Sequence, residues 1–185
     1  MDTHWISPAI VDQAMDVRFL EGELHQALVS VYDEIMWLSR RPNVTPSRAR
    51  AWYTHVMSES VKRRVRRFTG MVSTNALQST GEQLMLEHFL RIQTTLSELV
   101  ARHMKDQIHD ASEFLMILSA CERVHIVTRS ENYAAMRAKG DYATANIELV
   151  SWVNIPENQR QYLWVKMLRG KVANASDFSP ETQLR

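Results

Sequence analysis

The sequence contains little cysteine, glycine and proline, and it has no long apolar run. Its 185 residues include one cysteine, five glycines and five prolines. A single cysteine excludes an internal disulfide and a cysteine-rich zinc site. No apolar run approaches the ~20 residues of a membrane span. The N-terminal residues MDTHW include an acid where a signal peptide carries positive charge. We therefore expect a soluble, cytoplasmic protein that does not associate with membranes.

Several common catalytic signatures are also missing. The chain has no glycine-rich phosphate loop, no Gly-x-Ser-x-Gly turn around a nucleophile and no Cys-x-x-Cys pair. Their absence argues against the common nucleotide-dependent and nucleophilic enzymes. We predict a protein that is not an enzyme and that needs neither a cofactor nor a metal ion.

Apolar spacing and helix-boundary signals predict an all-α fold. Between Ile10 and Leu38, apolar residues recur at alternating steps of four and three, which is typical of a long helix packed at a shallow angle. Further helices are expected from Thr45-Pro46 to about Phe68, from Ser79 through Ile108, and onward from capping boxes at 110–113 and 128–131. We predict a single-domain bundle of five or six helices.

Two segments leave a short β element open. Residues 124–127 and 147–153 are rich in β-branched and aromatic side chains, and short apolar runs do not distinguish helix from strand. After Gly170 the chain becomes polar. We therefore expect a helical domain over 1–170 and a flexible C-terminal tail over 171–185. The apolar seam of residues 10–38 could also form a homodimer.

Positive charge is concentrated in one segment. Residues 40–67 contain nine Lys or Arg and one acid, a net charge of +8, whereas the whole chain is +1. The remainder therefore sums to about −7, with 13 basic and 20 acidic residues. Such a patch usually faces a polyanion. Like charges on adjacent helical turns repel each other, so an external anion would relieve this crowding.

We therefore predict a small nucleic-acid-binding protein, either regulatory or a subunit of a nucleoprotein assembly. Arginine forks suit bidentate contacts to phosphate, and an aromatic ring can stack on an unpaired base. The alternative is a helical adaptor whose basic helix docks on an acidic protein. The sequence does not distinguish DNA from RNA. The predicted nucleic-acid-binding residues are Arg48, Trp52, Lys62, Arg63, Arg64, Arg66 and Arg67.

A third hypothesis is catalytic. Arg50 and His55 have the Arg-x4-His spacing, and the six residues 50–55 resemble the motif of the HEPN helical ribonucleases. That resemblance implies that Arg50 and His55 would flank a phosphodiester. The residue after the arginine is Ala51, where that family often has a polar one.

Two Glu/Asp-x-x-His pairs have a spacing used in di-iron helical bundles. They are Glu122 with His125 and Asp106 with His109, and only sixteen residues and a predicted helix start separate them. In di-iron bundles such pairs come from separate long helices. We therefore interpret them as ordinary surface pairs.

Overall fold

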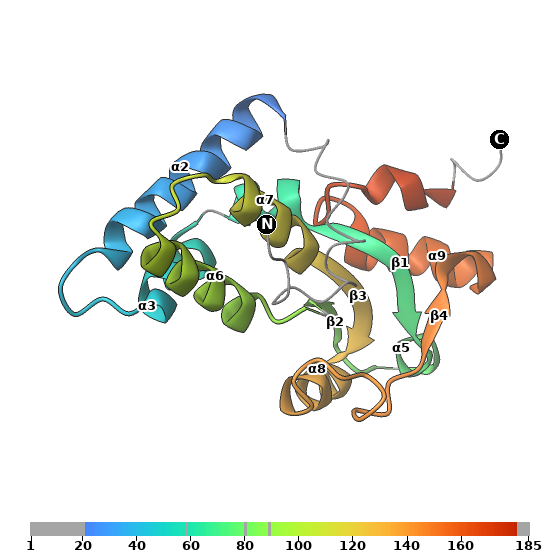
Figure 1. Ribbon diagram of the computed structural model, residues 1–185. Coiled ribbons are helices and arrows are strands. Elements are labelled where there is room, and N and C mark those ends of the chain that lie inside the picture. The colour runs from blue at the N-terminus through green and yellow to red at the C-terminus, as the bar shows by residue number, and fades with distance from the viewer. Residues whose placement is uncertain (1–20, 58, 80, 89, 181–185) are drawn as a thin grey trace. The chain divides into compact units, whose positions relative to one another are not determined.

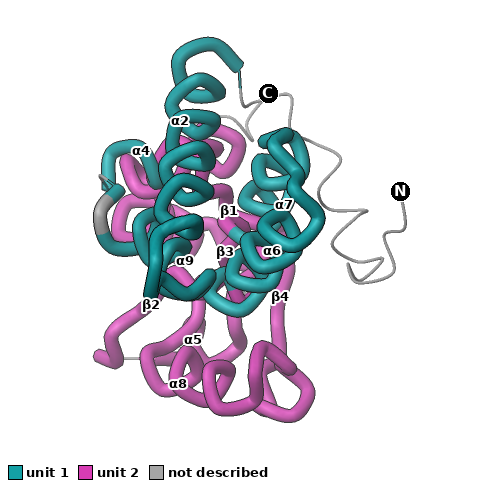
Figure 2. The backbone as a smooth tube through the Cα atoms, turned by 60° about the vertical axis from the view of Figure 1, so that its left-hand side comes forward, with its two compact units in different colours: residues 1–62, 92–121 teal, residues 63–91, 122–185 magenta. Residues whose placement is uncertain are grey.

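The computed structural model describes residues 21–57, 59–79, 81–88 and 90–180. The chain divides into two compact units. Unit 1 comprises residues 1–62 and 92–121, and unit 2 comprises residues 63–91 and 122–185 (Figure 2). Each unit is therefore built from two separate stretches of the chain.

Within its described residues, unit 1 is built from helices. Its α-helices are α2 (Gly22–Ser39), α3 (Pro46–Ala51), α6 (Ile92–Asp106) and α7 (Ser112–Cys121), and a π-helical stretch, η1 (Trp52–Val56), follows α3. The apolar residues of α2 face this unit's core: Leu28 and Ile35 are fully buried. Leu96 and Leu99 of α6 and Phe114 of α7 are equally buried, and α2 contacts both of these helices. The predicted seam between residues 24 and 35 is therefore used inside the unit.

Unit 2 contains a mixed four-stranded sheet in the order β2-β3-β1-β4. The strands are β1 (Arg67–Ser73), β2 (Leu84–His88), β3 (Arg123–Thr128) and β4 (Leu149–Ser151). The central strands β1 and β3 are parallel, and β2 and β4 pair antiparallel with β3 and β1 respectively. Both central arrows run toward the end where α5 (Thr74–Gln78) and α8 (Arg129–Arg137) lie (Figure 1).

One face of this sheet carries the apolar core of unit 2. Phe68, Val124 and Ile126 pack there with Leu163 and Met167. The last two belong to α9 (Glu157–Leu163) and to the π-helical stretch η3 (Trp164–Leu168), which continues it. Side chains alternate across a strand, so β3 directs its intervening residue, His125, to the opposite face. A short 3₁₀ turn, η2 (Trp152–Asn154), links β4 to α9.

The predicted all-α bundle is wrong, because unit 2 is built around a sheet. Of the two segments for which helix and strand were both left open, 124–127 lies within strand β3, and 147–153 includes strand β4. The helix predicted to reach Phe68 instead ends as α4 (Glu59–Val65), and the chain enters β1. Gly70 has φ 81° where the β1 register shifts, next to the Phe178 ring. A glycine at such a bulge permits a conformation that other residues resist.

The helix predicted from Ser79 is also wrong over its first part. Leu84–His88 is strand β2, because pairing with β3 overrides the helix preference of Leu and Met. The Glu82 amide does donate to Ser79 Oγ (3.1 Å), as in a capping box. The Glu82 carboxylate instead accepts from the Ser130 amide at 2.8 Å, so it helps to cap α8.

Other predicted boundaries are confirmed. Thr45 caps α3 with Pro46 at its first turn, and the Thr128–Glu131 capping box opens α8. The long helix predicted between Ile10 and Leu38 is not continuous, because Glu21 is extended and α2 begins at Gly22. Residues 1–20 lie outside the described residues.

Residues 171–180 do not form the predicted tail. The Asn174 side chain is buried and bonds to both the amide and the carbonyl of Phe68, at 2.9 and 3.0 Å. Phe178, in the 3₁₀ turn η4 (Ala175–Phe178), packs edge-on against the Phe68 ring. This segment therefore belongs to the core of unit 2. Residues 181–185 lie outside the described residues.

Candidate nucleic-acid interface

The basic segment 40–67 is divided between the two units. Arg40, Arg41, Arg48, Arg50 and Lys62 belong to unit 1, and Arg63, Arg64, Arg66 and Arg67 belong to unit 2. The segment does not form one helix either, because α3, η1, α4 and the start of β1 follow one another along it. Only Lys62, Arg63 and Arg64 of the basic cluster lie in α4, while Arg66 follows it and Arg67 begins β1.

Two of the predicted phosphate-binding arginines face carboxylates of their own unit. Arg66 Nε lies 3.6 Å from Glu122, and Arg67 lies 3.9 Å from Asp177. Glu122 is almost fully buried and also accepts from His88 at 3.1 Å. Arg66 and Arg67 are therefore better placed to hold strand β1 in position than to grip an external phosphate.

Two of the predicted nucleic-acid-binding residues in unit 1 also form hydrogen bonds within the protein. Trp52 Nε1 donates to Glu34, and Lys62 Nζ donates to the Thr54 carbonyl at 2.7 Å. Arg48 is exposed in the first turn of α3, and its backbone amide donates a hydrogen bond to the Thr45 hydroxyl. Of these three side chains, only that of Arg48 is exposed.

A second basic stretch, missed in the sequence, lies beside the first in unit 2. The Ala173 amide donates to the Arg66 carbonyl at 2.8 Å, and Lys171 is two residues before Ala173. This bond brings the end of η3 and its following turn to the start of β1. This bond joins the two basic stretches at Arg66 and Ala173. We call the exposed cations of the two stretches the basic edge: Arg63, Arg64, Lys166, Arg169 and Lys171.

The C-terminal part of the basic edge combines positive charge with aromatic rings. Lys166 Nζ lies 5.0 Å from the centre of the Tyr162 ring and donates to its hydroxyl, and the Arg169 guanidinium lies 5.7 Å from that of Trp164. Tyr162 is 55% exposed. Within the part of the chain that the structure describes, Lys166, Arg169 and Lys171 make no ion pair with a carboxylate. Among the described residues, therefore, no carboxylate neutralises the charge of these three side chains.

The face of the sheet opposite the apolar core carries a buried polar cluster. His125 Nδ1 lies 2.5 Å from Thr69 Oγ1, and its ring meets Tyr142 edge-on. Burial, assisted by the positive charge of Arg123, lowers the pKa of His125 to about 4. Its cross-strand neighbour Glu87 has a pKa raised by burial, which Arg91 only partly offsets. The cluster therefore favours neutral groups.

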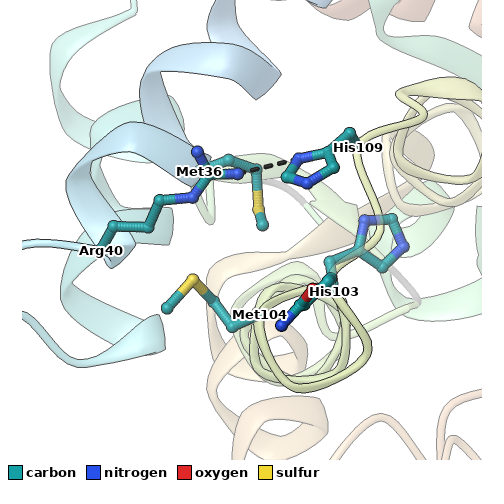
Figure 3. Close-up of a pocket in the computed structure, with 6 residues that line it drawn as sticks. Met36, Arg40, His103, Met104 and His109 are labelled. Atoms are coloured by element: carbon teal, nitrogen blue, oxygen red, sulfur yellow. Dashed lines mark hydrogen bonds between the residues drawn. The ribbon is translucent and has the colours of Figure 1, made fainter.

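Unit 1 contains a buried polar network and a half-open pocket beside it. The Tyr32 hydroxyl lies 2.7 Å from His103 Nδ1, and His103 Nε2 lies 2.9 Å from Glu113. Burial, reinforced by Asp110, raises the pKa of Tyr32 to about 12. Burial acts to raise the pKa of Glu113, but bonds from Arg102 and His103 outweigh it and lower the value. The pocket lies between α2 and α6 (Figure 3).

The arginine and histidine of the ribonuclease hypothesis have different environments. Arg50 is 6% exposed, and its Nη1 donates to Thr54 Oγ1 at 3.0 Å. Burial lowers the pKa of this arginine. His55 is exposed within the π-helical stretch η1. Because Arg50 is buried on Thr54, the arrangement gives little support to a paired phosphodiester site.

The Glu/Asp-x-x-His pairs are used in other contacts. Glu122 faces Arg66 and His88, and Arg40 Nη2 donates to His109 Nδ1 at 2.9 Å. Among the described residues, no group of three His, Cys, Asp or Glu side chains is placed to hold a metal ion.

A search of the described residues finds no helix of sufficient length and apolar character to cross a membrane. No known protein family, curated protein or solved structure matches this chain, so any functional assignment rests on its own residues.

Proposed function

We propose that this protein binds the phosphate backbone of nucleic acid through the basic edge of unit 2. The observation that supports this most strongly is the Ala173–Arg66 backbone bond, which places a second basic stretch beside the first. Counting the whole sequence of each unit, unit 2 has fourteen Lys or Arg and nine Asp or Glu, a net charge of +5. Electrostatic attraction of this kind supplies most of the affinity in binding that does not depend on base sequence.

The aromatic residues of the edge favour single-stranded over double-stranded nucleic acid. Tyr162 is exposed next to Lys166, and a ring of this kind can stack on an unpaired base. A duplex keeps its bases stacked on one another, so their faces are not free to stack on an aromatic side chain. We therefore expect tighter binding to a single strand than to a duplex of equal length.

Fluorescence anisotropy with labelled single-stranded RNA, single-stranded DNA and duplex DNA tests the proposal. The double variant Arg169→Glu/Lys171→Glu should weaken binding by about a hundredfold, since each lost charge-assisted contact is worth about a factor of ten. The matched control is Arg137→Glu/Lys139→Glu, which makes the same charge change elsewhere in unit 2. It should change affinity by about threefold or less.

Two results would contradict the proposal. Equal losses in both double variants would mean that net charge, and not the basic edge, governs binding. If none of the nucleic acids binds while polyglutamate does, and the edge variant abolishes that binding, the protein docks an acidic protein partner instead.

A further inference from the structure

The pocket in unit 1 has a defined size and lining. It measures about 270 Å³, and it lies between the C-terminal end of α2 and the end of α6 (Figure 3). None of its residues belongs to unit 2 or to the basic edge. Its lining residues are Met36, Arg40, His103, Met104, Gln107 and His109.

The inner part of the pocket is apolar and polarizable. Met36 from α2 and Met104 from α6 extend into the space between these two helices (Figure 3). Thioether sulfurs make favourable contacts with the edges and faces of aromatic rings. His103 is fully buried, and Tyr32 and Glu113 occupy both of its ring nitrogens. It therefore offers the pocket no free ring nitrogen.

The outer part of the pocket is rich in hydrogen-bond donors. Arg40 Nη2 donates to His109 Nδ1 at 2.9 Å, an arrangement that leaves the neutral histidine's proton on Nε2. Arg40 and His109 are both exposed. Asp110, which follows His109 in the sequence, already accepts hydrogen bonds from the Ser112 amide and hydroxyl, at 2.9 and 2.8 Å. Arginine donors of this kind suit the oxygens of a carboxylate or a phosphate.

We propose that this pocket binds a small organic anion that carries a planar ring system, with the ring between Met36 and Met104 and the anionic group on Arg40. An aromatic carboxylate and a nucleoside monophosphate share this chemistry. The volume falls slightly below the range of about 300–1,000 Å³ typical of sites for drug-sized ligands. One ring with one anionic group therefore fits the space better than a larger ligand.

Methyl NMR of the methionines in the full chain locates binding directly. Benzoate and adenosine monophosphate are titrated separately, with adenosine and inorganic phosphate as probes that lack one half of the ligand. Met104→Leu assigns one signal. We expect saturable shifts of the Met36 and Met104 methyl signals with benzoate or adenosine monophosphate. The tighter of the two identifies the anion class. Adenosine and phosphate should each bind at least tenfold more weakly.

The matched variants are Arg40→Gln and Arg41→Gln. Both remove one exposed positive charge from the same turn, but Arg41 does not line the pocket and stacks on Trp37 at 3.8 Å. Arg40→Gln should weaken binding at least tenfold, and Arg41→Gln by less than about twofold. The proposal is overturned if neither probe gives saturable methyl shifts, if phosphate alone binds equally well, or if the two variants lose affinity equally. None of these outcomes depends on the basic edge.

Discussion

The two units solve the problem of buried polar groups differently. Unit 1 encloses one continuous network, in which Tyr32, His103 and Glu113 connect three helices. Unit 2 places apolar and polar side chains on opposite faces of its sheet. Phe68, Val124 and Ile126 lie on one face, and His125 lies on the other. Both units depend on apolar packing, but unit 1 should in addition be sensitive to the loss of one hydrogen bond, and unit 2 to the protonation state of one histidine.

The units also differ in charge. Counting whole sequences, unit 1 has eight Lys or Arg and twelve Asp or Glu, a net charge of −4, whereas unit 2 is +5. The total of +1 hides this difference. Charge counted along the chain placed the positive region at residues 40–67. Counted by unit, it moves to unit 2, because the fold adds Lys166, Arg169 and Lys171 and assigns Arg40 and Arg48 to the acidic unit.

The largest expected effect comes from breaking the apolar face of unit 2. Phe68 is 3% exposed, and its ring meets those of Trp152 and Phe178. Phe68→Ala should lower the free energy of unfolding by about 3–5 kcal/mol. Hydrogen exchange should show faster opening of β1 and β3 than of α2 and α7. Leu28→Ala in unit 1 is the mirror experiment. Identical exchange patterns in the two variants would mean that the units do not behave as separate packing units.

The second effect is the pH response of unit 2. Because the pKa of His125 is lowered from 6.5 to about 4, its stabilising contribution is complete above pH 6.5. That contribution is lost as the pH falls toward 4, and it amounts to about 3 kcal/mol. Denaturant titrations between pH 7 and 4 measure it.

His125→Gln serves as the reference for that titration. In this variant, the free energy of unfolding should change less with pH. Glu87, whose pKa is raised, changes that free energy in the opposite direction in both proteins. A slope that is unchanged in the variant would assign the pH response to other groups.

The third effect concerns the network of unit 1. Tyr32→Phe keeps the ring but leaves the buried His103 Nδ1 without its partner. We expect a loss of about 1–3 kcal/mol in the free energy of unfolding. Tyr133→Phe is the control, because that tyrosine is 42% exposed and its hydroxyl accepts only a 3.3 Å bond from Arg129. Equal losses would show that the network adds nothing beyond an exposed hydrogen bond.

Local sequence signals located several helix boundaries but not the sheet. Thr45, Thr128 and Gly170 mark ends whose geometry depends on neighbours within one turn. Strand β2 has no β-branched residue, so its identity depends on pairing with β3, about forty residues away. Only the three-dimensional fold could show that Asn174 would be buried against Phe68.

The sequence indicated only one of the two basic stretches that form the candidate interface. The high density of positive charge at Arg63–Arg67 was enough to predict an anion-binding stretch there. The second stretch has four cations and one acid between Glu157 and Lys171, and it includes the exposed Tyr162. Charge balance in shorter windows could have identified this stretch. Its position beside Arg66 depends on a backbone bond that spans more than one hundred residues.

The salt dependence of binding tests the basic edge most directly. For wild-type protein, the logarithm of affinity for a single strand should fall linearly with the logarithm of salt concentration. Arg169→Ala/Lys171→Ala should reduce that slope by between one and two, because each lost phosphate contact removes about 0.7 from it on single strands. An unchanged slope, with or without a loss of affinity, would contradict phosphate binding at this edge.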